Sequence, residues 1–125
     1  PPMPLPAASF DLVFAASVFT HFDEAQQLAW LEELGRVLAP GGLLLASTHA
    51  PELVELRPEI VGERLMELER RGFLWESATG GFNDASAFHS PAYLAREWSP
   101  WFRLVRRESK ALFALQDLSL WEKPA

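Results

Sequence analysis

Residues 10–49 constrain the fold of this chain more than any other stretch of its sequence. They open with the apolar run Phe-Asp-Leu-Val-Phe-Ala-Ala at 10–16, which is rich in aromatic and branched side chains and carries one acid. Such a run is typical of a strand that is buried on both faces, as in a parallel sheet. A second apolar run, Leu-Leu-Leu-Ala at 43–46, predicts another strand.

The segment between these two runs predicts an amphipathic helix over residues 23–39. Asp23 is a typical helix cap, and Gln26 stands three residues later, where it completes a capping box. Apolar residues then follow at helical spacing, and several charged residues fall outside that stripe. The stripe consists of Leu28, Leu31, Leu34 or Gly35, and Leu38, and the charged residues outside it are Glu32, Glu33 and Arg36.

Pro40-Gly41-Gly42 predicts that the helix ends in a type II turn, because proline suits the second position and glycine supplies the positive φ of the third. A strand, a crossover helix and a parallel strand form one right-handed unit. The stretch therefore predicts an α/β fold with two neighbouring parallel strands.

Four pieces of the chain stand out by their order and spacing: Leu5-Pro6, Ser9-Phe10-Asp11-Leu12-Val13, Ser17-Val18-Phe19-Thr20-His21-Phe22 and Glu33-Leu34-Gly35-Arg36-Val37-Leu38-Ala39-Pro40-Gly41-Gly42. Together they resemble the second half of a class I, Rossmann-like S-adenosylmethionine-dependent methyltransferase. The resemblance implies a partial methyltransferase sheet without its first three strands, S-adenosylmethionine as cofactor, and methyl transfer to a small-molecule acceptor.

The family's glycine-rich loop is missing from this sequence, which contains no Gly-x-Gly pattern. The acid that ends the family's second strand is missing too. In nucleotide-binding α/β folds such a loop brings the backbone close to the cofactor, and the acid binds the ribose hydroxyls. We therefore expect the carboxy-terminal part of a methyltransferase, whether as a fragment, a truncated gene product or a degenerate copy. The missing loop leaves open whether this chain alone binds the cofactor and acts as an enzyme.

The 125 residues predict a single partial domain with three segments. Residues 1–50 hold the strand–helix–strand unit. Residues 51–100 predict a helical or lid-like insertion, with a helix from Pro58 to Gly72 and a short hairpin of residues 74–77 and 85–89 that turns at Gly80-Gly81. Residues 101–125 predict an antiparallel hairpin of strands 102–108 and 115–121.

Composition weighs against several classes of function. Eleven basic and seventeen acidic residues give a net charge of −6, which does not favour nucleic-acid binding. The chain has no cysteine, and its three histidines lack a short ligand spacing, so we expect no metal site. No apolar run approaches the roughly 20 residues of a membrane span, and no signal peptide opens the chain. We expect a cytoplasmic protein without membrane contact.

Ligands of open α/β sheets bind at the carboxyl ends of the parallel strands, and two such ends exist here. By resemblance, the residues after the first strand pass the methionine end of the cofactor. The alternative is that small residues there only let the chain turn into the helix. The cofactor-binding candidates are Ala16, Ser17, Val18 and Phe19.

The second strand ends at Ser47, Thr48 and His49, which by resemblance face the substrate. Capping of a turn explains Ser47 and Thr48 equally well. His89, in the insertion, is a further substrate-binding candidate, with a place in a surface turn as the alternative.

His21 is the catalytic candidate, because the family often has a histidine at this offset and an imidazole acts as a base near neutral pH. The alternative is that His21 hydrogen-bonds the start of the helix and holds the loop. No Gly-x-Ser-x-Gly elbow surrounds Ser17, so a hydrolase is not indicated.

Without three preceding strands, the strand at residues 10–16 has an unpaired edge. An apolar edge of this kind invites pairing with another chain. We expect it to pair in a homodimer or with a complementing chain, or to be covered by residues 1–8. The alternative function is therefore a truncated or vestigial methyltransferase-like module that has no cofactor site of its own and acts through dimerisation or a partner chain.

Overall fold

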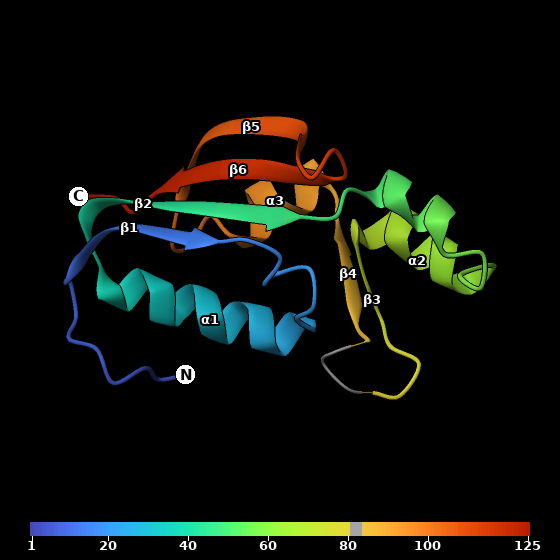
Figure 1. Ribbon diagram of the computed structural model, residues 1–125, viewed down its shortest axis with the longest axis horizontal. Helices are drawn as coiled ribbons and strands as arrows, with labels where there is room; N and C mark the ends of the chain where they lie inside the picture. The colour runs from blue at the N-terminus through green and yellow to red at the C-terminus, as the bar shows by residue number, and fades with distance from the viewer. Residues whose placement is uncertain (81–83) are drawn as a thin grey trace.

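The computed structural model describes residues 1–80 and 84–125. Its main sheet has the strand order β1-β2-β6-β5, and β3 and β4 form a small separate sheet (Figure 1). The strands are β1 (Phe10–Ala15), β2 (Leu38–Thr48), β3 (Phe73–Glu76), β4 (Ser86–His89), β5 (Arg103–Leu112) and β6 (Gln116–Glu122). The helices are α1 (Glu24–Val37), the 3-10 helix η1 (Pro51–Leu56), α2 (Glu63–Arg71) and α3 (Pro91–Glu97).

β1 and β2 are adjacent and parallel, with Val13 beside Leu44 and Ala15 beside Ala46. Because α1 connects them, the predicted strand–helix–strand unit is confirmed. β6 pairs antiparallel with β2 on one side and with β5 on the other. The sheet therefore has the predicted architecture of two parallel strands followed by an antiparallel hairpin.

The start of α1 has the predicted capping box. The Gln26 amide donates to the Asp23 carboxylate at 2.8 Å, and the Gln26 side chain accepts from the Asp23 amide at 3.0 Å. Leu31 and Leu34 face the core, as their spacing predicts. Together the two reciprocal hydrogen bonds satisfy backbone donors that a helix start otherwise leaves unpaired.

Glu33 was predicted to lie outside the buried stripe, and this is wrong. The N-terminal segment runs along α1 and covers it, so that Glu33 accepts hydrogen bonds from Arg36 at 2.7 Å and from the Met3 amide at 2.7 Å. The Arg36 guanidinium, helped by the Met3 amide, lowers the pKa of Glu33 to about 2. Glu33 therefore stays ionised and anchors the N-terminal segment to α1.

β2 is longer than the predicted strand at residues 43–46, and α1 ends at Val37 rather than at the proline. Gly41 has a φ of 77°, the positive value that the predicted turn requires. β2 continues on both sides of residues 43–46 because β6 pairs with it as far as Thr48, while Gly41 and Gly42 exchange backbone hydrogen bonds with Lys123.

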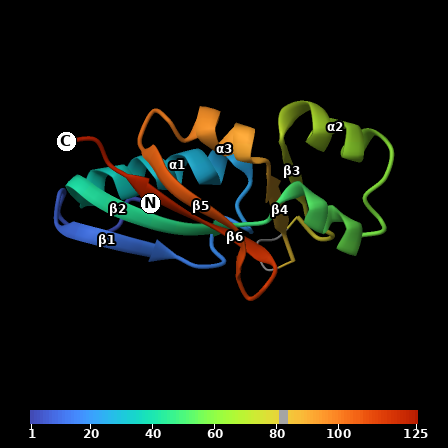
Figure 2. The same ribbon diagram turned by 90° about the horizontal axis from the view of Figure 1, so that it is seen from above.

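In the described part of the chain, helices cover one face of the main sheet and leave the other uncovered. α1 and α3 lie on the same side of the strands (Figure 2). Their side chains share one core with the inward-facing residues of β1, β2 and β6. That core contains Ala15, Leu31, Leu34, Val37, Leu44, Ala46, Leu94, Trp98 and Trp121, among others.

The opposite face of β1 is bare, so the prediction of a strand buried on both faces is wrong. Leu12 and Phe14 are 57% and 55% exposed. Phe14 pairs in register with Leu45 of β2, which pairs with Leu120 of β6, so apolar side chains continue across this face. The burial that the sequence pattern implies requires a further layer on this side.

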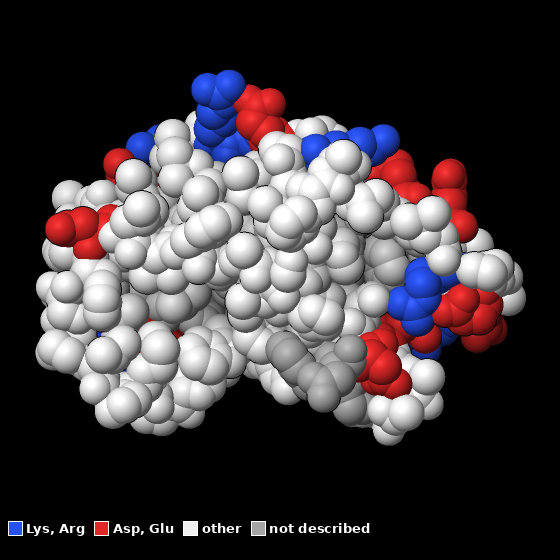
Figure 3. All heavy atoms as spheres, in the orientation of Figure 1, with Lys and Arg blue, Asp and Glu red and all other residues white. Residues whose placement is uncertain are grey.

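The two edges of the sheet differ in charge. β5 carries several charged side chains, a common protection of edge strands, whereas Asp11 is the one charged residue of β1. Figure 3 shows a broad uncharged surface over β1 and α1, with charges gathered along β5 and around α2. Residues 1–8 do not cover the β1 edge, because Ala8 and Ser9 donate to carbonyls at the end of α1.

The insertion begins differently from its prediction. α2 starts at Glu63 rather than at Pro58, since Gly62 interrupts the chain with a φ of 61° and Val61 points into solvent. Gly72 ends α2 in the left-handed conformation, as predicted. β3 and β4 form the predicted hairpin, and the Gly81 half of its predicted turn lies outside the described residues.

A buried polar network ties α1 to β4 and α3. The His89 Nε2–H donates to the Gln27 side-chain oxygen at 2.6 Å, the Trp98 indole donates to the same oxygen at 3.1 Å, and the Gln27 amide donates to the Tyr93 hydroxyl at 3.0 Å. Tyr93 in turn donates to Glu24 at 2.6 Å. His89 is 1% exposed, so its predicted place in a lid or a surface turn is wrong.

We predict that His89 makes the folding stability fall in mild acid. Burial lowers the pKa of His89 from 6.5 to about 3, so below about pH 6.5 the unfolded chain takes up a proton that the native chain does not. The free energy of unfolding should therefore fall by about 1.4 kcal/mol per pH unit from this group. Urea denaturation between about pH 6.5 and pH 5 measures this slope.

The control for this prediction is His89→Gln, which removes the titrating group. Its unfolding free energy should vary less with pH over the same range, although it is lower at neutral pH. Equal slopes for the variant and the parent chain would contradict the assignment.

Candidate functional site

The carboxyl ends of β1 and β2 lie side by side, and a small polar cluster holds the loop that follows β1. The Ser17 amide donates to the Ser47 hydroxyl at 2.7 Å, and the Gln116 side-chain amide donates to the Ser17 hydroxyl at 3.0 Å. Ser17 has a φ of 56°, a left-handed conformation that costs a non-glycine residue about 1 kcal/mol or more. The strain is held by two partners from distant parts of the chain.

The structure places the four cofactor candidates differently from one another. Ala16 and Val18 are exposed, and Ser17 is half-buried. Phe19 is completely buried, with its ring 5.4 Å from that of Phe22 and 4.8 Å from that of Trp98. The Phe19 side chain therefore packs in the core and anchors the loop, whereas residues 16–18 form one wall, partly exposed to solvent, at the end of β1.

Of the three substrate candidates at the end of β2, His49 is the one that lines a pocket described below. Ser47 is buried and committed to Ser17. Thr48 is 1% exposed, and its hydroxyl has no hydrogen-bond partner within the described part of the chain. His49 lines a pocket of about 140 Å³ between β2, η1, β4 and the β5–β6 hairpin. Burial is the main reason that the pKa of His49 is lowered, and the charge of His21 adds to it.

His21 fastens the loop after β1 to the insertion. Its Nδ1 lies 2.9 Å from the Ala85 carbonyl, and its own carbonyl accepts from the Trp75 indole at 3.1 Å. These two contacts, both to the segment of β3 and β4, agree with the loop-holding alternative described for His21. The Nδ1 contact gives the imidazole a fixed orientation.

Among the residues that line this pocket, sequence reasoning had identified only His49 as a candidate. Arg57 comes from the end of η1, Phe88 from β4 and Gln116 from the start of β6. A basic residue, an aromatic residue and an amide at such separations carry no local signal. They meet because β4 joins the ends of both parallel strands: Ala87 donates to the Thr20 carbonyl at 2.7 Å and His89 to the His49 carbonyl at 2.8 Å.

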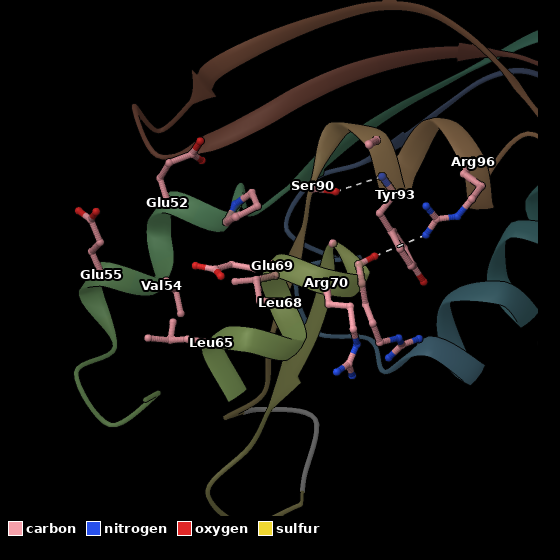
Figure 4. A pocket seen from close by; sticks show the side chains of 14 residues that line it. Glu52, Val54, Glu55, Leu65, Leu68, Glu69, Arg70, Ser90, Tyr93 and Arg96 are labelled. Atoms are coloured by element: carbon pink, nitrogen blue, oxygen red, sulfur yellow. Dashed lines mark hydrogen bonds between the residues drawn. The ribbon is translucent and has the colours of Figure 1, made fainter. Parts of the chain in front are cut away.

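A larger pocket, of about 430 Å³, lies between η1, α2 and α3 (Figure 4). Two of its three arginines are already engaged, because Arg71 pairs with Glu24 at 2.8 Å and Arg96 pairs with Glu97 at 2.8 Å. Neither the loop after β1 nor Gln116 contributes to its walls. Chemistry at the strand ends therefore points to the smaller pocket beside His49.

Within residues 1–80 and 84–125, no group of three or more histidine, aspartate or glutamate side chains could hold a metal ion. No helix in this part of the chain has the length and apolar character that crossing a membrane requires.

Residues 2–46 match a family described as a methyltransferase domain. The fold is similar to a S-adenosylmethionine-dependent methyltransferase from Methanosarcina mazei, with a TM-score of 0.73 and 16% identity over 98% of this chain and 63% of that one. It is also similar to the 1,6-didemethyltoxoflavin-N1-methyltransferase of Burkholderia thailandensis, solved with 1,6-didemethyltoxoflavin and S-adenosylhomocysteine. That match has a TM-score of 0.63 and 14% identity over 95% of this chain and 46% of that one.

A further similar structure is the N-methyltransferase NodS of Bradyrhizobium japonicum with S-adenosylhomocysteine, at a TM-score of 0.56 and 15% identity over 95% of this chain and 48% of that one. The chain thus spans less than two thirds of the length of these solved proteins. The family match covers β1, α1 and most of β2. The chain therefore has the fold of class I S-adenosylmethionine-dependent methyltransferases over a part of their length.

Proposed function

We propose that this chain forms the acceptor side of a S-adenosylmethionine-dependent methyltransferase that acts on a small molecule. One observation carries the proposal: the parallel strands β1 and β2 end together at a strained loop, and a pocket with His49 in its wall lies beside them. In open α/β sheets this is the edge at which ligands bind.

The residues present fit S-adenosylmethionine on one side only. Ala16 and Val18 offer an exposed wall, and the strained backbone of Ser17 leaves the surface at the end of β1 open. This wall has no acid to bind ribose hydroxyls, and the sequence has no glycine-rich loop. We infer that residues 16–18 contact the methionine end of the cofactor and that sequence paired along β1 completes the site.

Methyl transfer asks little acid–base chemistry of the protein. The bound cofactor supplies a methyl group on a sulfonium, which the acceptor attacks in line while the electron pair of the breaking bond stays on sulfur. The chain's own residues would orient the acceptor, exclude water and, where the acceptor carries a proton, accept it. His49 suits the last task because its lowered pKa keeps it neutral, and a neutral imidazole accepts a proton.

The first test is a titration of the chain with S-adenosylhomocysteine, followed by amide chemical shifts. We expect shifts at residues 15–19 and weak affinity, because the chain provides one wall of the site. Val18→Lys should abolish these shifts, since Val18 is exposed on that wall. Val105→Lys is the matched control, because Val105 is a similarly exposed valine on β5 and should leave them unchanged. Shifts confined to other regions would overturn the proposal.

A second candidate function is that of a module that works through a partner chain, and the open edge of β1 favours it. Leu12 and Phe14 are exposed beside an edge that carries little charge. A partner strand would satisfy the free backbone groups of β1, and a layer above it would cover both side chains.

This candidate predicts self-association in the absence of a partner. Sedimentation velocity should show a concentration-dependent dimer or larger species, and Phe14→Lys should reduce it because a charge opposes burial of this strand. Leu104→Lys on β5 is the control and should have little effect. A chain that stays monomeric, with rapid hydrogen exchange at residues 10–15, would contradict pairing through β1.

A further inference from the structure

The pocket beside His49 is mainly apolar and has the size of one ring. Its volume is about 140 Å³, and an engineered protein cavity of about 150 Å³ is known to bind benzene. Leu53, Phe88 and Leu115 supply its apolar walls. The Phe88 ring centre lies 5.8 Å from that of His49, so an aromatic guest would meet two rings on one side. The pocket therefore has room for one apolar ring.

One cation, Arg57, lies at this apolar pocket. Its Nε donates to Glu59 at 2.5 Å and its Nη1 donates to Ser86 at 2.8 Å. These two contacts fix the guanidinium plane. Within the described residues, the Nη2 of Arg57 makes no hydrogen bond, so a donor pair remains available. Glu59 is 56% exposed, so solvent screens the compensating charge.

The other titratable groups near the pocket add no negative charge to its wall. His49 is kept neutral because burial, His21 and Arg57 all lower its pKa. Gln116 is uncharged and lines the pocket. Its side-chain amide also donates to the Ser17 hydroxyl at 3.0 Å, which connects the pocket to the Ser17 loop. An anion at Arg57 would therefore meet no carboxylate inside the pocket.

The loop next to the pocket stores backbone strain. Lys110, near the end of β5, has a φ of 53°, and Phe113 and Ala114, in the β5–β6 connection, have φ values of 55° and 56°. Non-glycine residues in this conformation cost roughly 1–3 kcal/mol each and cluster at ligand sites. This loop leads directly into Leu115 and Gln116 of the pocket.

We propose that this pocket binds a small molecule with a single apolar ring and a carboxylate, with the ring between Leu53, Phe88 and Leu115 and the carboxylate on Nη2 of Arg57. The planar guanidinium matches a carboxylate better than an ammonium does. The inference rests on the proposed function for its biological meaning, since such a molecule would be the methyl acceptor or a part of it. Gln116 places this ligand next to the Ser17 loop.

Benzoate is the probe, and benzyl alcohol of similar size without charge is the matched ligand. Amide shifts of the chain should report benzoate at His49, Leu53 and Phe88. Benzoate should bind more tightly than benzyl alcohol by about tenfold, the effect of one hydrogen bond between charged groups. Equal affinities for benzoate and benzyl alcohol, or shifts only at other residues, would overturn the proposal. This comparison needs no substitution in the chain.

Arg57→Gln should reduce benzoate affinity by about tenfold and leave benzyl alcohol unaffected. Arg106→Gln is the control, because Arg106 is a surface residue of β5 that pairs with Glu108, and it should change neither ligand. Benzoate binding that survives Arg57→Gln would overturn the assignment of the carboxylate. Benzoate and S-adenosylhomocysteine report on different residues, so loss of one signal with the other intact shows which proposal has failed.

Discussion

The parallel pairing of β1 with β2 is the constraint on which the rest of this structure depends. It brings the ends of two strands, separated by the whole of α1, to one edge. Parallel strands cannot be joined by a tight turn, so the crossover helix has to pack on the sheet. α1 does so with Leu31 and Leu34, and α3 covers the same face with Leu94 and Trp98. The opposite face of β1 keeps the apolar side chains of Leu12 and Phe14 in solvent.

The insertion is hydrogen-bonded to the segments that follow β1 and β2. β4 donates backbone hydrogen bonds to residues after both β1 and β2, and His21 adds a side-chain contact to the Ala85 carbonyl. In the core, the buried Gln27 side chain makes hydrogen bonds with His89 of β4, Tyr93 of α3 and Trp98 at the end of α3. Buried polar groups of this kind need specific partners, so they define one orientation of the insertion on the core. The wall beside His49 is consequently well defined.

The family match and the fold similarity differ in how much of the chain they cover. The family match ends at Ala46, whereas the fold similarity extends over nearly the whole chain. The remaining segments keep the fold at low identity because sheet order and a covered face tolerate many sequences. Side chains that would select an acceptor come from these segments, where Arg57, Phe88 and Gln116 lie.

The sequence by itself determined the local elements of this protein: the cap at Asp23, the apolar stripe of α1, the positive φ at Gly41 and the two strands that α1 connects. Each depends on residues within a few positions, so spacing and residue type suffice to predict it. Tertiary structure alone decided that Glu33 and His89 are buried, that Leu12 and Phe14 are exposed, and that Arg57 and Gln116 reach the pocket beside His49. Those outcomes depend on which distant segment packs on each side chain, and no local pattern encodes that partner.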